Sequence, residues 1–436
     1  MKGKSIIVGF LVIALLAVCG LSIFAIWQGV QMAQSSGVRF RVGSINTVEA
    51  KDTEEKTLSV NGPMDLKVDN DFGFVTVQPG ADGKVVVTAE KTAWGSNDAD
   101  AQQALKDLKV VIEQNGNEIR VHLQRPAEID LINISPSGAQ ANFTITVPIE
   151  TNVDLKSDNG ELTLSGTQGT ASLNTSFGDV TVKELTGGLL VTASNGRITA
   201  ENISADDTSI SLSSDFGDIN TDTIAGEDVT VKSTNGAMTL NQVEASGKLE
   251  ARSDFGDLEI RTGTAGILDV HTSNGKVLVE DFNVSGPATV SSDFGDLTFI
   301  DVLSDGMDLK TQNGRVTING AQGRIKAQSS FGDVEVSAKD AIVTLISDNG
   351  KVSFNGTLID GEHTLQTDFG DINLTLPADI ALNFDLKTDF GKIKSDLPVT
   401  ISGDIDEKHW IGTINGGGAK LIVSTQNGNI IIQTSK

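Results

Sequence analysis

The sequence predicts an all-β protein: a single-stranded β-helix, or β-solenoid, with rungs of about 19 residues. The first observation is a repeating corner with phenylalanine, separated by 39, 39, 39, 37 and 38 residues at Phe177, Phe216, Phe255, Phe294, Phe331 and Phe369. The second is an asparagine corner between or beside these, at Asn159, Asn195, Asn235, Asn274, Asn313 and Asn349. The third is that no helical pattern separates the corners. A fixed period in this range is typical of repeat architectures.

One rung, Leu249 to Gly266, shows the strand pattern. Leu249 and Ala251 alternate with charged residues before the corner, and Leu258 and Ile260 do so after it. Alternation with a period of two predicts strands with one apolar face. A single rung cannot bury that face alone, so we expect the rungs to stack about 4.8 Å apart around a continuous core.

Each corner contains a glycine directly after the phenylalanine or asparagine. Glycine tolerates positive φ, and we expect the tight corners to require it. The predicted structural corners are Gly160, Gly178, Gly196, Gly217, Gly236, Gly256, Gly275, Gly295, Gly314, Gly332, Gly350 and Gly370.

From Asp179 onward, the residue after each corner glycine alternates in charge along the chain, with Ala237 as the one neutral member. The predicted charge ladder comprises Asp179, Arg197, Asp218, Asp257, Lys276, Asp296, Arg315, Asp333, Lys351, Asp371 and Lys392. In a stack, opposite charges would face each other on adjacent rungs, at about 0.2–1 kcal/mol per pair. A slip by one rung would bring like charges together, so the ladder would also fix the register. Phe390 follows Phe369 with no asparagine corner between them, yet Lys392 still follows Asp371.

The direction of the phenylalanine side chains has two interpretations. Counting inward residues from Leu249 places Phe255 inside the corner, stacked with Asn235 and Asn274. In the competing interpretation the side chains point outward, as an apolar stripe that would bind glycans or a partner. This possible binding stripe comprises Phe177, Phe216, Phe255, Phe294, Phe331 and Phe369.

The N-terminal residues predict a membrane anchor. Residues 1–4 form a basic tail, and residues 5–27 are uncharged and mostly apolar, which as a helix gives about 35 Å. No small-x-small cleavage site follows, so we expect an uncleaved transmembrane signal anchor. Lys2 and Lys4 favour a cytoplasmic N-terminus, with the remainder outside the membrane. Cys19, the sole cysteine, lies in this segment, so the remainder can form no disulfide within the chain.

Three further regions follow the anchor. Residues 28–43 predict a short stalk, residues 44–150 an N-terminal capping region, and residues 151–436 the solenoid repeats with a C-terminal cap. In the capping region, Ser96-Asn97-Asp98 can cap a short helix with Ala101, Ala104, Leu105 and Leu108 on one face. Val110 to Leu123 predicts a hairpin across Asn115-Gly116. Near the C-terminus, Asp404 to Gly418 breaks the period, and Leu421 to Gln433 is a last strand-corner-strand unit.

Charge disfavours nucleic acid as a partner. Residues 1–43 carry four basic and no acidic residues, whereas the remainder holds 29 basic and 58 acidic residues, a net charge of −29. Such a surface repels polyanions and anionic bilayers, and it also keeps a long exposed β-structure soluble.

Asp-Phe-Gly-Asp resembles acidic calcium loops, but no glycine-rich nonapeptide or EF-hand loop accompanies it. Bases or alanine occupy the intervening rungs, which favours corners and a charge ladder over calcium sites. His122, His271, His363 and His409 are not paired at metal-ligand spacing. The rungs are nearly uniform, without the long loops that form a catalytic cleft. We therefore predict no metal, no cofactor, no catalytic residues and no enzyme.

Two stretches carry a family resemblance. Ala141 to Pro148 is a strand ending in Val-Pro, and Val153 to Leu164 is a repeat of the form apolar-x-apolar followed by Asn-Gly-x-apolar. This pattern resembles the bacterial toastrack, or putative-adhesin, β-solenoid family over roughly residues 44–436. The resemblance implies a bacterial cell-envelope protein, because family members are envelope proteins and some are attached to membrane modules of envelope stress systems.

These observations lead to three hypotheses. The first is an adhesin-like or envelope-sensing protein, held by a single pass in the bacterial cell membrane, with the solenoid outside and an envelope protein or glycan as partner. The second is a scaffold that assembles end to end through Leu421–Gln433. The third is a glycan-active enzyme, which turnover of a polysaccharide would reveal.

Overall fold

The computed structural model describes residues 48–124, 138–402 and 406–435. Those after Val48 belong to one compact unit. Among the described residues, no helix combines the length and apolar character that crossing a membrane requires. The predicted tail, anchor and stalk, residues 1–43, lie outside the described ranges.

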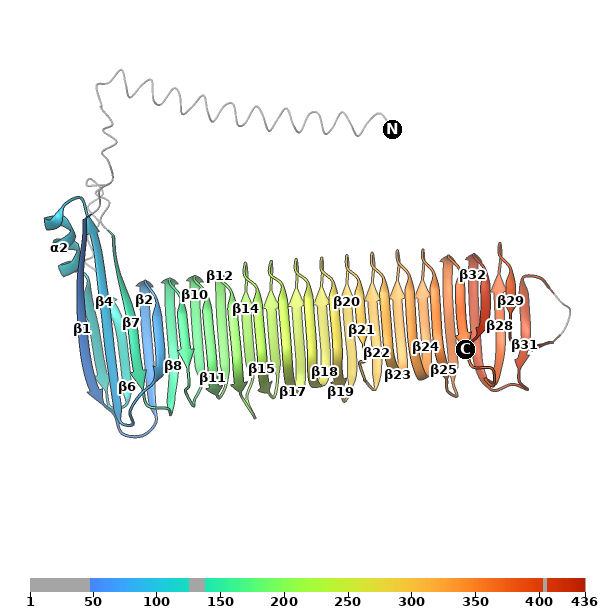
Figure 1. The fold of residues 1–436 in the computed structure, drawn as a ribbon, viewed down its shortest axis with the longest axis horizontal. Helices are drawn as coiled ribbons and strands as arrows, with labels where there is room; N and C mark the ends of the chain where they lie inside the picture. Colours follow the sequence, from blue (N-terminus) through green and yellow to red (C-terminus); the bar gives the residue numbers. More distant parts are fainter. Residues whose placement is uncertain (1–47, 125–137, 403–405, 436) are drawn as a thin grey trace, which may run out of the picture. The chain divides into compact units, whose positions relative to one another are not determined.

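The strands form one continuous sheet that winds into a β-solenoid, as predicted (Figure 1). Each rung has an incoming strand, the corner with phenylalanine or asparagine, and an outgoing strand. Neighbouring rungs pair in parallel, with partners 18 residues apart at Ala171 and Leu189 and 21 apart at Leu189 and Ile210. The period in the sequence is thus the length of one rung.

The incoming strands form one side of the solenoid. In spatial order they are β5 (Lys109–Asn115), β6 (Glu118–Gln124), β2 (Met64–Phe72), β8 (Thr151–Asn159), β10 (Ala171–Phe177), β12 (Leu189–Asn195), β14 (Ile210–Ser214), β16 (Val229–Ser233), the second parts of β17 (Met238–Ser253) and β18 (Leu258–Thr272), β20 (Pro287–Ser292), β22 (Gly306–Thr311), the second parts of β23 (Val316–Ser329) and β24 (Val334–Ser347), β26 (Glu362–Phe369), β32 (Ala419–Asn427), β28 (Leu382–Thr388), β31 (His409–Ile414) and β30 (Val399–Ile401).

The outgoing strands form the other side. In spatial order they are β1 (Val48–Ser59), β4 (Lys84–Gly95), β7 (Gly138–Val147), β3 (Val75–Pro79), β9 (Leu162–Ser165), β11 (Val180–Thr186), β13 (Ile198–Ser204), β15 (Ile219–Gly226), the first parts of β17 and β18, β19 (Val277–Val284), β21 (Leu297–Ile300), the first parts of β23 and β24, β25 (Val352–Leu358), β27 (Ile372–Leu376), β33 (Ile430–Thr434) and β29 (Ile393–Ser395).

The predicted helix and hairpin are present. Helix α2 (Asp98–Asp107) begins after Asn97, whose side chain accepts a hydrogen bond from the Asp100 amide, and its Ala101 and Leu105 are buried. Strands β5 and β6 pair antiparallel across the turn at Gly116, which has φ +62°. Both elements follow from local signals, a capping residue and an Asn-Gly turn.

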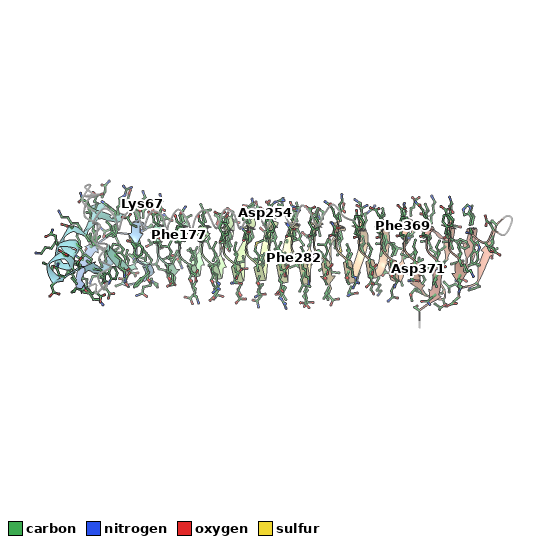
Figure 2. The ribbon with its side chains drawn as sticks, turned by 90° about the horizontal axis from the view of Figure 1, so that it is seen from above. Lys67, Phe177, Asp254, Phe282, Phe369 and Asp371 are labelled. Carbon is green, nitrogen blue, oxygen red and sulfur yellow. The ribbon has the colours of Figure 1, made fainter. Side chains whose placement is uncertain are left out.

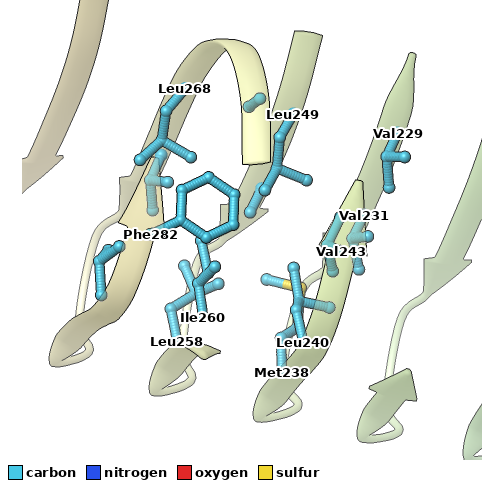
Figure 3. Packing of buried hydrophobic residues seen from close by; sticks show 14 of the residues in the cluster. Val229, Val231, Met238, Leu240, Val243, Leu249, Leu258, Ile260, Leu268 and Phe282 are labelled. Atoms are coloured by element: carbon cyan, nitrogen blue, oxygen red, sulfur yellow. The ribbon is translucent and has the colours of Figure 1, made fainter. Parts of the chain in front are cut away.

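The core lies between the two sides and runs along the whole stack. On most strands its residues alternate with more exposed ones, as do Leu249, Ala251, Leu258 and Ile260, all 0% exposed. Phe282 belongs to this core, packed beside Leu268 and Ile260 (Figure 3). The alternation predicted from the sequence is therefore confirmed.

The two ends of the stack depart from the order of the chain. At one end, the rung β2–β3 lies between β6 and β7 on its outer side and β8 and β9 on its inner side. At the other end, the last rung, β32–β33, inserts between β26–β27 and β28–β29. The chain thus builds an outer rung and then returns into the stack.

This insertion corrects the predicted end-to-end contact. Leu421–Gln433 does not form a free edge, because β32 and β33 are paired on both sides. On the incoming side, the antiparallel strands β31 and β30 continue the sheet beyond β28. The outermost strand, β30, has 3 residues, and a very short edge strand is one way that natural sheets limit edge-to-edge association.

A left-handed residue bends the outgoing strand of most rungs. Non-glycine residues have φ between 49° and 56° at Glu184, Asn202, Thr223, Gln242, Thr262, Asp281, Asp301 and Asp340. The bend interrupts the alternation, so Lys183 and Glu184 are both exposed before Leu185 returns to the core. Nothing in the sequence pattern had indicated this bend, because the residue type differs from rung to rung.

Candidate functional site: an exposed row of corner residues

The most prominent feature outside the core is the row of corner residues, here called the corner row. In space it runs Phe72, Asn159, Phe177, Asn195, Phe216, Asn235, Phe255, Asn274, Phe294, Asn313, Phe331, Asn349, Phe369, Asn427 and Phe390. Figure 2 looks onto the stack from above, with Phe177 towards one end and Phe369 towards the other. With rungs about 4.7–4.9 Å apart, successive phenylalanines are about 9.4–9.8 Å apart.

The phenylalanines of the corner row point outward, so the inward prediction is wrong. Phe255 is 59% exposed, and the other seven range from 46% at Phe72 to 77% at Phe390. The corner turns over two consecutive outward residues, Asp254 and Phe255, after the buried Ser253. Counting strict alternation through the corner therefore placed Phe255 on the wrong side.

Chain insertion at the C-terminal end keeps the alternation of the corner row. The sequence has no asparagine corner between Phe369 and Phe390, but Asn427 of the inserted strand β32 pairs with Phe369. The amide of Phe390 donates to the carbonyl of Gln426, which places Phe390 on the other side of Asn427. The tertiary structure thus supplies the alternation that the linear sequence lacks at this end. At the opposite end, Asn159 lies between Phe72 and Phe177, as it does in the sequence.

The asparagines of the corner row join neighbouring rungs. Asn195 donates from Nδ2 to the carbonyl of Ser176 over 3.2 Å, and Asn274 donates to that of Asp254 over 3.3 Å. Asn235 and Asn349 make the same contact with the preceding rung. A short polar side chain therefore occupies each interval between rings, and the rings stay separated.

Close stacking explains the corner glycines. A Cβ at any of the twelve predicted positions would lie 1.7–2.2 Å from the carbonyl oxygen of the glycine in the adjacent rung; at Gly256 this is the oxygen of Gly236, at 2.1 Å. Among the twelve, φ is positive at Gly178 alone, at +157°. The predicted reason, positive φ, is therefore wrong for the other eleven, which are required because backbones approach too closely for a side chain.

A buried Ser or Thr lies two residues before most corner residues, and at many of these positions its hydroxyl bonds a corner glycine. Ala193 takes that position before Asn195, and the hydroxyls of Ser157 and Ser253 have no partner among the described residues. Ser329 donates to the carbonyl of Gly314 over 2.7 Å, and Thr367 donates to that of Gly350 over 2.8 Å. The same bond recurs at Ser214, Ser292, Thr311, Ser347, Thr388 and Thr425. We had overlooked this signal, which is visible in the sequence as a recurring Ser or Thr at that position.

The charge ladder forms a column, but its main bond differs from the predicted ion pair. The Oδ1 atom of Asp257 accepts the backbone amide of Lys276 over 2.8 Å, and Asp179, Asp218, Asp296 and Asp333 do the same for the next rung. Among the described residues, one ladder pair, Arg315 and Asp333, lies within ion-pair distance, at 3.5 Å. A backbone amide is available whatever the residue, so Ala237 fits in the ladder.

The predicted neighbours Asp371 and Lys392 do not lie on adjacent rungs. Asn429 of the inserted last rung lies between them: its amide donates to Asp371 Oδ1 over 2.7 Å, and its Oδ1 accepts the amide of Lys392 over 3.1 Å. The prediction failed because it assumed that order along the chain is order in the stack.

A separate ion-pair cluster lies on the incoming side. Glu250 accepts from Arg252 Nε over 2.8 Å and from Lys248 Nζ over 3.0 Å, with Lys232 Nζ at 3.3 Å. These hydrogen bonds, that of Arg252 first, lower the pKa of Glu250 from 4.5 to about 2. The cluster stabilises the negative charge of Glu250. It also links three rungs, because Asp269 on the next strand bonds Lys248.

The histidines do not form a site. His363 is buried, donates from Nε2 to the carbonyl of Ile359 over 2.9 Å, and burial lowers its pKa. His409 pairs with Asp385, and His271 with Ser291. Among the described residues, no three His, Cys, Asp or Glu side chains are grouped to hold a metal ion.

A shallow hollow of about 510 Å³ lies on the incoming side near the N-terminal end of the stack. Strands β2, β8, β10, β12 and β14 line it, with Asn152, Ser172 and the exposed Leu190 among its residues. No pattern in the sequence indicated this hollow, because its lining residues come from five separate strands.

The fold and the corner row define a β-solenoid protein that exposes a regularly spaced row of phenylalanine rings along one edge. The chain belongs to the Toastrack DUF4097 family, whose model matches residues 65–284 and 266–433. The predicted resemblance is thus confirmed.

Solved structures share low identity with the chain. A putative cell adhesion protein from Clostridium sporogenes is 9% identical, covering 88% of this chain and 100% of its own, with a TM-score of 0.16. A putative adhesin from Bacteroides fragilis is 12% identical, with coverage of 88% and 98% and a TM-score of 0.18. A putative adhesin from Parabacteroides distasonis is 11% identical, with coverage of 74% and 97% and a TM-score of 0.22. No curated protein matches the chain.

Proposed function

We propose that this protein is an adhesin-like binding protein, without enzymatic activity, whose binding face is the corner row. The observation that carries the proposal is the outward position of all eight phenylalanines of the corner row. Exposed apolar residues scattered singly are normal on protein surfaces, but eight exposed rings in one regularly spaced row are not scattered, and such a feature favours a binding site. Here the outward rings recur over about 65–70 Å of stacked rungs.

The insertion of β32 supports a role for the row as a whole. A row with function only at its centre would not need Asn427 between Phe369 and Phe390. The insertion of β32 adds Asn427 to the row and keeps Phe390 at the regular spacing of two rungs. A linear, regularly spaced face suits a partner that is itself linear and repeating.

The proposal places the solenoid outside a bacterial cell membrane, held by residues 5–27 as a single-pass anchor. Its support is the uncharged run of the sequence and the basic tail before it. Envelope sensing would use the same arrangement, because an anchored face can report what it binds. N-terminal sequencing and protease treatment of intact cells test the anchor; a mature start near Gln34, or a protected C-terminus, would contradict it.

Adhesion tests the binding face. Beads that carry the full chain should retain bacterial envelope material, and the triple variant F216A/F255A/F294A should retain much less. The matched control is L190A, which removes an exposed apolar side chain from the incoming side. Equal retention by the triple variant, with an unchanged melting temperature, would overturn the proposed binding face.

A further inference from the structure

We propose that the corner row binds an extended, β-1,4-linked glycan that is neutral or carries amines, with every second sugar ring on a phenylalanine. This inference rests on the proposed binding face and specifies its ligand. Three properties of the row carry it: its repeat length, its excess of hydrogen-bond acceptors and its charge.

The repeat length excludes an extended peptide strand. Successive phenylalanines lie two rungs apart, about 9.4–9.8 Å, whereas side chains on one face of a β-strand repeat about every 6.4–6.8 Å. Two ligand classes do match. A polyproline II helix repeats about every 9.3 Å, from three residues at about 3.1 Å each. In an extended β-1,4-linked glycan, alternate sugar rings present the same face, and the disaccharide repeat is close to two rungs.

Hydrogen-bond chemistry distinguishes these two ligands. Next to the rings, no hydrogen bond or ion pair of the described residues engages the carboxylates of Asp215 and Asp254, whereas Asp293 accepts from Gln312 Nε2 over 2.8 Å. Ionised carboxylates can only accept hydrogen bonds. The asparagines use one Nδ2 hydrogen on the preceding rung, which leaves Oδ1 as an acceptor and the second hydrogen as a donor. A polyproline helix offers carbonyl acceptors and no backbone donors, so the aspartate carboxylates would find no donor on it. Sugar hydroxyls donate, and the C–H face of a pyranose stacks on an aromatic ring.

Charge narrows the class of glycan. Each of Phe216, Phe255 and Phe294 has an aspartate before it and another after its glycine. Ladder bases such as Lys276 lie on the neighbouring rungs, and the charged side chains on the same rung as each of these rings are acidic. Residues 44–436 carry a net charge of −29, which repels uronate, sulfate and phosphate polymers. A neutral glycan meets no repulsion, and amine groups would be attracted.

Titration calorimetry of the full chain in detergent tests the ligand. The probes are the hexasaccharides of β-1,4-linked glucose and N-acetylglucosamine, their disaccharides, an α-1,4-linked hexasaccharide, polygalacturonate and a proline-rich peptide. A hexasaccharide reaches three rings and a disaccharide one, so we expect at least ten-fold tighter binding of one or both β-1,4 hexasaccharides. The F216A/F255A/F294A variant should lose at least ten-fold, and L190A should bind as the wild type does.

A second variant tests the spacing. N235F adds a ring between Phe216 and Phe255, so rings follow one rung apart there. If binding depends on the two-rung repeat, N235F weakens hexasaccharide binding. Tighter binding would show that the row binds through non-specific apolar contact, and would overturn the inference.

The outcomes separate the inference from the function on which it rests. No binding of either β-1,4 hexasaccharide, or equal binding of the α-1,4 probe, overturns the glycan inference. If the triple variant still loses envelope adhesion, the binding face stands with another ligand. Binding of the proline-rich peptide in place of the sugars would also overturn the inference. Unchanged adhesion by the triple variant overturns both.

Discussion

Phe282 and Phe255 lie 27 residues apart in the same repeat, yet one is 1% exposed and the other 59%. Phe282 follows the left-handed residue Asp281 on an outgoing strand and returns into the core between the two sides (Figure 3). Phe255 lies at the corner, where two consecutive residues turn outward. The comparison shows that residue type does not decide burial in this solenoid; position relative to the two backbone bends does.

The largest expected effect on stability comes from removing the buried ring of Phe282 from the core. F282A should lower the free energy of unfolding by about 3–5 kcal/mol, because the ring is lost and the rigid rungs close the cavity only partly. F255A should change it by no more than about 0.5 kcal/mol, as is usual for exposed positions. Denaturant melts of the two variants measure the difference, and similar losses in both would contradict the outward placement of the corner row.

Gly256 sharpens the comparison, because it lies next to Phe255 and yet tolerates substitution far less well. G256A should cost about 1–3 kcal/mol, since the new Cβ would lie 2.1 Å from the carbonyl oxygen of Gly236 and the rungs must separate. The control is G306A on β22, where no heavy atom lies within 4 Å of the added Cβ. Thermal melts should rank G256A well below G306A; the reverse order would mean that the corners are not closely stacked.

An outward side chain can contribute to stability when opposite charges surround it, and Glu250 is an example. Its pKa is lowered to about 2 when folded, so its stabilising effect is complete above the unfolded value of 4.5 and is lost as the pH falls towards 2. After allowance for solvent screening, E250Q should cost about 1 kcal/mol at pH 7. The gap between wild type and E250Q should shrink from pH 6 to pH 3 in urea melts, and a constant gap would exclude the linkage.

The smallest expected effect concerns the charge ladder. The backbone amide of Lys276 donates to Asp257, so K276D keeps that bond and adds only repulsion from Asp257 and Asp296. We expect about 0.5 kcal/mol more destabilisation than for K276A, and less in high salt. Melts of both variants at two salt concentrations measure the gap. If K276D were the more stable of the two at low salt, the ladder charges would have no role in register.

Much of the fold was readable from the sequence. Corners about 19 residues apart, strict alternation, the Asn97 cap and the Asn115-Gly116 turn are local signals, and local backbone geometry obeys them. The corner residues themselves were also identified correctly, because a residue repeated at one position of each rung must form a column once the rungs stack.

The tertiary structure alone decided the order of the rungs and the direction of the rings. Asn427 lies beside Phe369 because the last rung inserts into the stack, and strand order in space is set by pairing partners that may be distant in sequence. Phe255 points outward because the corner turns over two consecutive exposed residues, and the glycine backbones of adjacent rungs stack too closely for a side chain to fit between them. Such packing constraints involve neighbouring rungs, so no period within a single rung can reveal them.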